Sequence, residues 1–219
     1  MKRKFQHIAY LLMVAAVLTS CGEKKQTSEF PDWAWADFQR PEGINPIVSP
    51  DTTTVFYCPM RQDSVAWESS DTFNPAATIY DGKVVVLYRA EDNSAVGIGS
   101  RTSRLGYAYS DDGLHFNRMT VPVFYPADDN QKELEWPGGC EDPRVAVTDD
   151  GLYVMLYTQW NRKQARLAVA TSRDLQIWEK YGPAFAKAYG GRFFDEFSKS
   201  ASIVTKLVDG KQVIAKIDG

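Results

Sequence analysis

Three Asp-Gly turns divide the chain into units of similar length, and this repeat restricts the folds that the chain can form. The turns begin at Asp81, Asp150 and Asp209, so that 69 and 59 residues separate successive copies. Each of the first two turns is followed by an apolar run and then by an Arg-Leu segment, at Arg104 and Arg166. Repeats of about 60 residues that consist of short strands and turns are typical of β-propeller blades. The sequence therefore predicts an all-β propeller.

The composition agrees with this class and limits the number of blades. Of the 219 residues, 44% are hydrophobic and 13% are aromatic, and no long helical periodicity follows residue 20. The repeat accounts for about three blades, whereas a ring of five blades at this period needs roughly 300 residues or more. Because the chain ends on an Asp-Gly turn signal, we expect residues 38–219 to be a partial propeller that is truncated inside the fold. A small, complete β-domain is the alternative.

The N-terminus has the pattern of a bacterial lipoprotein signal. Basic residues precede an apolar run at 8–18, which is too short to span a bilayer. The run ends in Leu-Thr-Ser-Cys, which resembles a lipobox that is cut before Cys21. We expect a signal peptide at 1–20, lipid on Cys21 and a tether at 21–37. The protein is then exported to the periplasmic side of a bacterial cell membrane, with the outer membrane or cell surface as further options. A cleaved secretory signal with an incidental cysteine is the alternative.

The charge balance limits the partners. The formal net charge is −3, from 25 basic and 28 acidic residues. Removal of residues 1–20 takes away three basic residues and no acidic one, which leaves 22 against 28 and a charge of −6. An acidic surface argues against nucleic acid and anionic lipid as partners. Attachment to a membrane would therefore come from the lipid on Cys21 alone.

Several catalytic classes have little support in the sequence. Beyond residue 20 there is one histidine, His115, at a repeat position where the other copy has Ile177. We expect a surface or packing role for His115, which disfavours Ser-His-Asp and Cys-His catalysis. No phosphate loop or dinucleotide motif occurs, and no Cys or His cluster has the spacing of a metal site. Cys58 and Cys140 could form a disulfide or remain buried thiols. Acid–base chemistry must then come from carboxylates.

Polar segments in which the two repeats differ are the candidates for a site. They carry Asn74 before a proline, Arg89 at a strand end, and Glu141, Asp142 and Arg144 within one short stretch. We expect Pro143 to hold Asp142 extended and these groups to face the central channel. The alternative is structural: Glu141 or Asp142 pairs with Arg144 or Arg89, and Asn74 forms a turn.

Five motifs, in this order, resemble glycoside hydrolase family 130 over roughly residues 38–219. They are Phe-Asn-Pro-Ala-Ala at 73–77, Tyr-Arg-Ala-Glu-Asp at 88–92, Thr-Ser-Arg-Leu-Gly at 102–106, Gly-Gly-Cys-Glu-Asp-Pro-Arg at 138–144 and Ser-Lys-Ser at 198–200. That family comprises β-mannoside phosphorylases and β-mannosidases on a five-bladed propeller. The resemblance implies inverting cleavage of a β-mannosidic bond in a β-mannoside oligosaccharide.

The resemblance also implies roles for individual residues. Asp142 would be the general acid. The substrate-binding residues would be Asn74 and Arg89, which hold the non-reducing mannose, with Arg104, Glu141 and Arg144 beside them. Arg162 and Lys199 resemble the cations that bind phosphate in the phosphorylases.

Two reaction routes share Asp142 and differ in the nucleophile. Attack by water needs a second carboxylate ~6.5–9.5 Å from the acid, which Asp195, Glu196 or a residue beyond 219 could supply. Attack by phosphate needs Arg and Lys instead, with inorganic phosphate as co-substrate and no other cofactor. Export slightly favours hydrolysis, because a sugar phosphate has most value in a cytoplasm; phosphorolysis is the alternative. A non-catalytic glycan-binding lipoprotein is a second alternative. We expect residues 1–219 alone to be inactive, and the sequence leaves the oligomeric state open.

Overall fold

The computed structural model describes residues 39–217, and nearly all regular structure in this part of the chain is β. The strands are, in chain order, β1 (Phe56–Cys58), β2 (Asp63–Val65), β3 (Asp71–Tyr80), β4 (Lys83–Glu91), β5 (Ser103–Ser110), β6 (Asn117–Arg118), β7 (Gly139–Val147), β8 (Tyr153–Trp160), β9 (Ala165–Ser172), β10 (Glu179–Pro183), β11 (Thr205–Val208) and β12 (Lys211–Ile214). Two short helical segments accompany them, α2 (Lys132–Glu135) and η1 (Ala188–Gly191). The predicted all-β class is therefore confirmed. All these elements belong to the unit that begins at Glu42.

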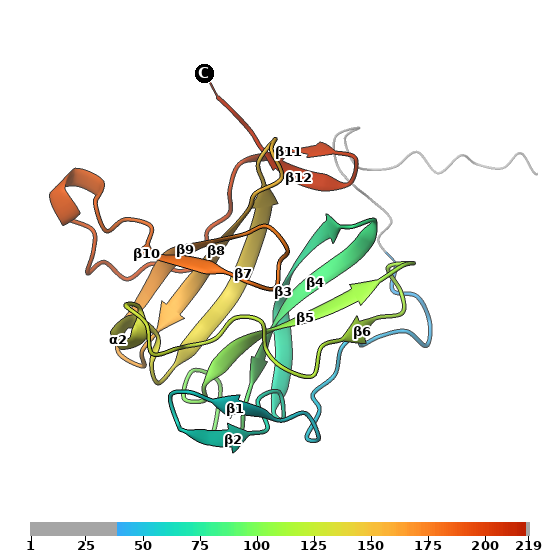
Figure 1. The fold of residues 1–219 in the computed structure, drawn as a ribbon, viewed down its shortest axis with the longest axis horizontal. Helices are drawn as coiled ribbons and strands as arrows, with labels where there is room; N and C mark the ends of the chain where they lie inside the picture. Colours follow the sequence, from blue (N-terminus) through green and yellow to red (C-terminus); the bar gives the residue numbers. More distant parts are fainter. Residues whose placement is uncertain (1–38, 218–219) are drawn as a thin grey trace, which may run out of the picture. The chain divides into compact units, whose positions relative to one another are not determined.

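Two antiparallel meanders of four strands follow the sequence repeat. Strands β3, β4, β5 and β6 pair in succession, and β7, β8, β9 and β10 do the same (Figure 1). The turn between β3 and β4 has positive φ at both central residues, 48° at Asp81 and 73° at Gly82. Two such residues form a tight hairpin turn whose twist matches that of the two flanking strands. Each of the first two repeats thus folds as one meander.

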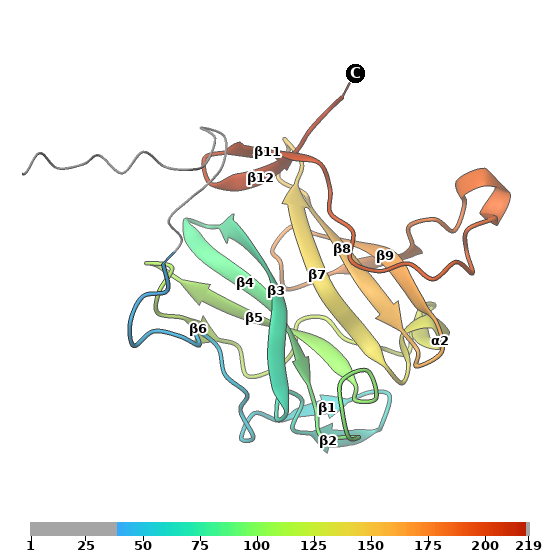
Figure 2. The ribbon, with the colours of Figure 1, turned by 180° about the vertical axis from the view of Figure 1, so that it is seen from behind.

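The meanders meet near their first strands. Ser103 at the start of β5 pairs with Gly139 at the start of β7, and Val213 of β12 pairs with Val147 at the other end of β7. Figures 1 and 2, seen from opposite sides, both place β3 beside β7 and the β11–β12 hairpin near the end of β7. The first strands of successive repeats therefore border the same space.

Each of these first strands contains a β-bulge. The pairing of β3 with β4 skips the two residues between Phe73 and Ala76. The pairing of β7 with β8 skips the two residues between Glu141 and Arg144. A bulge bends its strand and re-aims the side chains of the unpaired residues.

The two bulges lie at equivalent positions, each in the first strand of its meander. One contains Asn-Pro and the other contains Asp-Pro. The residue before each proline has positive φ, 45° at Asn74 and 52° at Asp142. The prediction that Pro143 holds Asp142 extended is therefore wrong. The bulge, supported by pairing on both sides, places Asp142 in the left-handed region, which short polar residues tolerate best.

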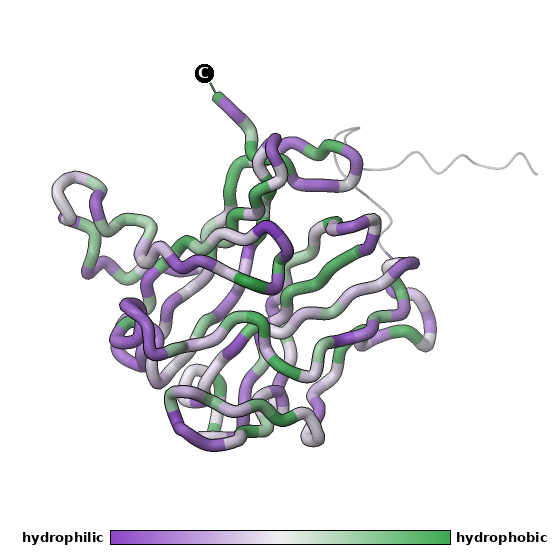
Figure 3. Tube along the Cα trace, viewed as in Figure 1, coloured by the Kyte–Doolittle hydropathy of each residue, from purple (hydrophilic) through white to green (hydrophobic). Residues whose placement is uncertain are grey.

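Apolar side chains of both meanders form the main core, which includes Leu87, Leu105, Val145, Met155 and Ala168. In Figure 3 a hydrophobic stretch runs along β4, while hydrophilic segments lie mainly at turns. Dense packing beneath the bulges fixes the strands that carry them.

A buried polar triad recurs in the two repeats. In each, a tyrosine of the second strand donates a hydrogen bond to a glutamate that precedes the first strand, and a cation from the fourth strand pairs with that glutamate. The two sets are Tyr88, Glu68 and Arg118, and Tyr157, Glu135 and Lys180. Both glutamates have 0% exposed surface. Each triad therefore links the second and fourth strands of its meander to the segment before the first strand, and its buried glutamate is paired with a cation.

Both cysteines of the described residues are free and buried, so Cys58 and Cys140 are structural thiols. His115 is exposed, as expected, and lies against Asp112 in a turn. Within residues 39–217, no helix is long and apolar enough to cross a membrane. The predicted signal peptide, Cys21 and the tether lie outside the described residues.

Candidate active site

The two bulges bring Asn74 and Asp142 into direct contact. The Asn74 side-chain amide Nδ2 donates a hydrogen bond of 2.8 Å to Asp142 Oδ1. Asp142 is buried, whereas Asn74 is exposed to solvent. Equivalent positions of two neighbouring repeats thus form the centre of the site.

Arg89 of β4 lies behind this pair and binds three carboxylates. Its NH1 nitrogen is 3.1 Å from Asp142 Oδ1, and its NH2 nitrogen is 2.8 Å from Glu141 Oε1 and 2.5 Å from Glu91 Oε1. Its Nε donates to Ser103 Oγ at 3.0 Å. Arg89 is 2% exposed. A guanidinium with a fixed plane suits this arrangement, because its nitrogens diverge toward several acceptors at once.

Lys199, in an irregular segment before β11, contacts the other oxygens of Glu141 and Asp142. Its Nζ lies 2.5 Å from Glu141 Oε2 and 3.2 Å from Asp142 Oδ2. The backbone beside it is held because Ser198 bonds to β9 through both its N–H and its hydroxyl. The Lys199 side chain is nevertheless 37% exposed. It is therefore the cation of the site that an incoming group can reach.

The surroundings of Asp142 favour its ionised form. Burial has the largest effect and raises the pKa of Asp142, but the Asn74 hydrogen bond and the charges of Arg89 and Lys199 together outweigh it. The net result is a pKa below the ordinary value for an aspartate. Asp142 is thus a carboxylate at neutral pH in this arrangement.

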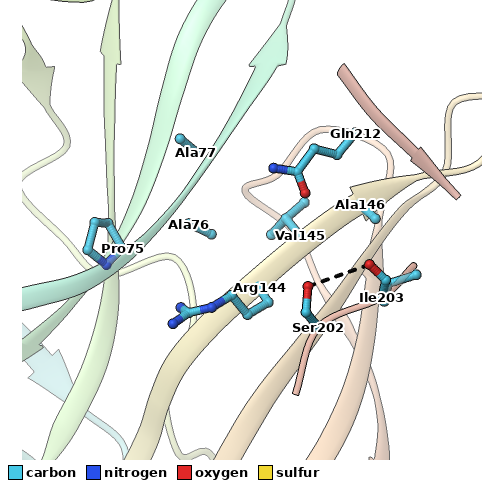
Figure 4. A pocket seen from close by; sticks show the side chains of 9 residues that line it. All are labelled: Pro75, Ala76, Ala77, Arg144, Val145, Ala146, Ser202, Ile203 and Gln212. Carbon is cyan, nitrogen blue, oxygen red and sulfur yellow. Dashed lines mark hydrogen bonds between the residues drawn. The ribbon is translucent and has the colours of Figure 1, made fainter. Parts of the chain in front are cut away.

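A small cavity lies beside the bulges, between the first strands and the segment that leads to β11 (Figure 4). Its volume is about 130 Å³. It is lined by Pro75, Ala76, Ala77, Arg144, Val145, Ala146, Ser202, Ile203 and Gln212. In Figure 4 the Arg144 side chain extends toward Pro75 across the cavity. Because one water occupies ~30 Å³ of liquid, this volume holds a few waters and is far below the ~300 Å³ of a small ligand pocket.

Four other predicted residues do not contact the cluster. The substrate-binding role expected of Arg104 is corrected. Arg104 follows Ser103 along β5, so its side chain lies on the other face of the strand. There it is 0% exposed and pairs with Asp92 at 2.9 Å, so it is a structural residue. Arg144 donates to the carbonyl of Pro143 and lines the cavity. The remaining two are also elsewhere: Arg162 is exposed in the β8–β9 turn, and Asp195 is exposed and paired with Arg166.

Comparisons with known proteins identify the family of the chain. A family model described as beta-1,4-mannooligosaccharide phosphorylase matches residues 39–219. The chain belongs to glycoside hydrolase family 130. The matched residues include both bulges and the cluster around Asp142.

One curated relative and one solved structure are similar to most of this chain. The 1,2-beta-oligomannan phosphorylase of Thermoanaerobacter is 36% identical over 152 residues, which cover 68% of this chain and 46% of that protein. A crystal structure of a Bacteroides thetaiotaomicron protein is 99% identical, with a TM-score of 0.85, and covers 88% of this chain and 55% of that chain.

A third relative is also known as a solved structure. Its structure is described by the words "The GH130 family of mannoside phosphorylases contains glycoside hydrolases that target beta-1,2 mannosidic linkages in Candida mannan". It is 69% identical, has a TM-score of 0.85, and covers 87% of this chain and 53% of that chain. The present chain therefore spans about half the length of the family 130 relatives that it matches.

Two members of the site were missed by the sequence analysis. Glu91 and Ser103 both contact Arg89, and both are 0% exposed. A signal existed for Glu91, because Arg89 and Glu91 are two residues apart and therefore share one face of a strand. No comparable signal existed for Ser103, whose place depends on the pairing of β5 with β4. Within residues 39–217, no group of three or more His, Cys, Asp or Glu side chains is arranged to hold a metal ion.

Proposed function

We propose that this protein cleaves β-1,2-mannosidic bonds with inversion, and that Asp142 is its general acid. The observation that carries the proposal is the buried Asp142 carboxylate, which faces solvent-exposed Asn74 and accessible Lys199 at the junction of two repeats. The linkage follows relatives whose names specify β-1,2-mannosides: an oligomannan phosphorylase and a mannobiose phosphorylase. Because the chain spans about half the length of its relatives, this activity is proposed for a protein of their full length.

Phosphate is the first candidate for the nucleophile. The family model and both curated relatives are named as phosphorylases, which favours phosphorolysis over the hydrolysis that the sequence analysis preferred. Lys199 supports this route, because an exposed ammonium beside the acid is available to a phosphate dianion. Arg162 gives no such support, since it lies in an exposed turn away from the cluster.

Water is the second candidate, and one observation favours it. The 69% identical relative comes from work that reports glycoside hydrolases within the family. Hydrolysis needs a second carboxylate as base. Asp195, considered for that role, is 84% exposed and bound to Arg166, so a hydrolytic base would lie elsewhere.

The acid role imposes one condition on the site. A general acid must hold a proton, yet the donors around Asp142 lower its pKa. The substrate must therefore displace one of these donors. Lys199 is the more accessible of the two cations, because 37% of its side-chain surface is exposed, against 3% for Arg89. Departure of a cation from Asp142 raises its pKa and allows it to take up a proton.

The meanders support a five-bladed propeller in the whole protein, which we include in the proposal. The described part would supply two blades and, in the β11–β12 hairpin, the start of a third.

We also propose export and lipidation, from the residues near Cys21. Substitution of Cys21 by alanine should abolish incorporation of labelled palmitate in the producing bacterium; unchanged labelling would refute the anchor.

Product analysis of the full-length protein tests the proposed reaction. Incubation with β-1,2-mannobiose and phosphate should give mannose 1-phosphate, and Asp142→Asn should lower kcat by about 10²–10⁴-fold. Asp111→Asn, which changes an exposed aspartate paired with Lys83, serves as the control and should keep full activity. Free mannose with or without phosphate would identify a hydrolase. Binding of the disaccharide without turnover, retained in Asp142→Asn, would identify a glycan-binding protein.

A further inference from the structure

Glu91 is a buried carboxylate with no assigned role, and it lies directly behind the proposed acid. It is the last residue of β4 and is 0% exposed. Its Oε1 is 2.5 Å from Arg89 NH2 and accepts a hydrogen bond from Ser103 Oγ at 3.2 Å. Since no part of Glu91 reaches solvent, it cannot touch a sugar. Any effect on the reaction must act through its neighbours.

Glu91, Arg89 and Ser103 form a closed ring of hydrogen bonds. Arg89 Nε donates to Ser103 Oγ, Ser103 Oγ donates to Glu91 Oε1, and Arg89 NH2 donates to the same Glu91 oxygen. Two contacts from different nitrogens fix the plane of the guanidinium. With that plane fixed, the remaining nitrogen, NH1, is directed at Asp142. The Phe73 ring, 4.5 Å from the guanidinium, covers one of its faces.

The second oxygen of Glu91 connects this ring to the loop between β4 and β5. Arg101 NH1 is 3.4 Å from Glu91 Oε2 and also pairs with Asp71 at the start of β3. Arg101 further donates to the carbonyl of Ala95 within the loop. Glu91 is therefore held from both sides and has no freedom to release Arg89.

We propose that Glu91 is a positioning residue, which orients the Arg89 guanidinium toward Asp142 and balances its charge. This inference rests on the proposed function, in which Asp142 is the acid. Asp142 pairs with Arg89 of β4, whose further partner is Glu91, and with Lys199 from the segment before β11; along β7 it lies between Glu141 and Arg144. Glu91 pairs with Arg89, and its negative charge partly neutralises the guanidinium that lowers the pKa of Asp142.

Two variants of the full-length protein test this role. Glu91→Gln keeps the shape and removes the charge, so kcat should fall by about 100-fold, as for a small misplacement of a catalytic group. KM should change less. The basic limb of the pH–rate profile should move to lower pH, because loss of a nearby negative charge stabilises the Asp142 carboxylate. Glu91→Asp keeps the charge, so the basic limb should stay in place while kcat is partly lost.

Glu68→Gln is the matched control, because Glu68 has the same 0% exposure and binds Tyr88 and Arg118 instead of the site. It should lower stability but leave kcat and the pH profile unchanged. If Glu91→Gln behaves like Glu68→Gln, Glu91 is merely structural and the proposal is overturned.

A second readout needs no substrate and separates this inference from the proposed reaction. Carbon-13 NMR follows the titration of the Asp142 carboxyl group in the protein alone. In Glu91→Gln that titration should move to lower pH, and it should remain in place in Glu68→Gln. An unmoved titration in Glu91→Gln overturns the electrostatic role even if β-mannosides are cleaved. A shifted titration supports it even if they are not.

Discussion

At the scale of the residue, the charge of Asp142 depends on two cations of very different accessibility. Arg89 is locked by three carboxylates, whereas Lys199 reaches Asp142 from the solvent side. Asn74 completes the set with a neutral donor. Of the two phosphate-binding candidates from the sequence, Lys199 lies at the site and Arg162 lies in an exposed turn, so only Lys199 can influence the acid directly.

The Lys199→Gln variant should therefore raise the pKa of Asp142 toward its ordinary value, while Arg162→Gln should leave it unchanged. Carboxyl carbon-13 NMR of both variants measures this difference. For stability, a lowered folded-state pKa contributes above the unfolded pKa and is lost as pH falls through the folded pKa. Lys199→Gln should thus lose about 1 kcal/mol or less at neutral pH, since the lysine is partly exposed, and no difference should remain in acid. An equal pKa in both variants would contradict the prediction.

At the scale of the element, the start of β7 is the segment with the least room. Gly139 has φ of 116°, and a Cβ there would lie 2.2 Å from the Ser103 carbonyl oxygen. A backbone atom cannot move aside as a side chain can. Because Ser103 belongs to the ring that orients Arg89, the close approach of β7 to β5 also sets the geometry of the site.

Gly139→Ala should accordingly destabilise the protein by about 2–5 kcal/mol, from ~1–2 kcal/mol of backbone strain and ~1–3 kcal/mol of overpacking. Gly151→Ala is the matched control, since Gly151 also has positive φ but a Cβ there meets no atom within 4 Å. It should cost about 1–2 kcal/mol, the strain alone. Urea unfolding of both variants measures the difference, and equal losses would show that β7 shifts away from Ser103 at little cost.

At the scale of the whole molecule, each meander contains a buried charge that its outer strand neutralises. Glu135 has a raised pKa, chiefly through burial, which the charge of Lys180 only partly offsets. Burial lowers the pKa of Lys180, but Cys140 and the carboxylates of Glu135 and Asp129 outweigh it, so that the pKa is raised overall. Loss of one partner leaves the other buried and uncompensated.

Lys180→Met should therefore destabilise the protein by about 3–5 kcal/mol at neutral pH. The loss should shrink as pH falls through the folded-state pKa of Glu135, because protonation removes the unpaired charge; it is smallest below the unfolded pKa. Lys132→Met, which breaks an exposed pair with Asp128, should cost less than about 0.5 kcal/mol at any pH. Urea unfolding at several pH values measures both, and a loss for Lys180→Met that is independent of pH would argue against an electrostatic cause.

The local pattern of the sequence was sufficient for the fold class and for the segments that form the site. Asp81-Gly82 closes its hairpin because both residues tolerate positive φ, and this depends on neighbours in the chain alone. Asn74, Arg89, Glu141 and Asp142 were identified where the repeats differ, Lys199 was implied by the family resemblance, and all five meet in space. Their motifs were informative because the site uses residues near strand ends and bulges.

Only the tertiary structure decided which of these residues touch. Asn74 and Asp142 looked like features in which the repeats differ, yet they occupy the same bulge of successive repeats and bond across 68 positions of sequence. Arg104 was assigned to the site, but strand alternation gives the site Ser103 and the core Arg104. Side-chain direction in a strand reverses at every residue and shifts at every bulge. Strand register is a non-local property, and so sequence specified the strands while their packing selected the site.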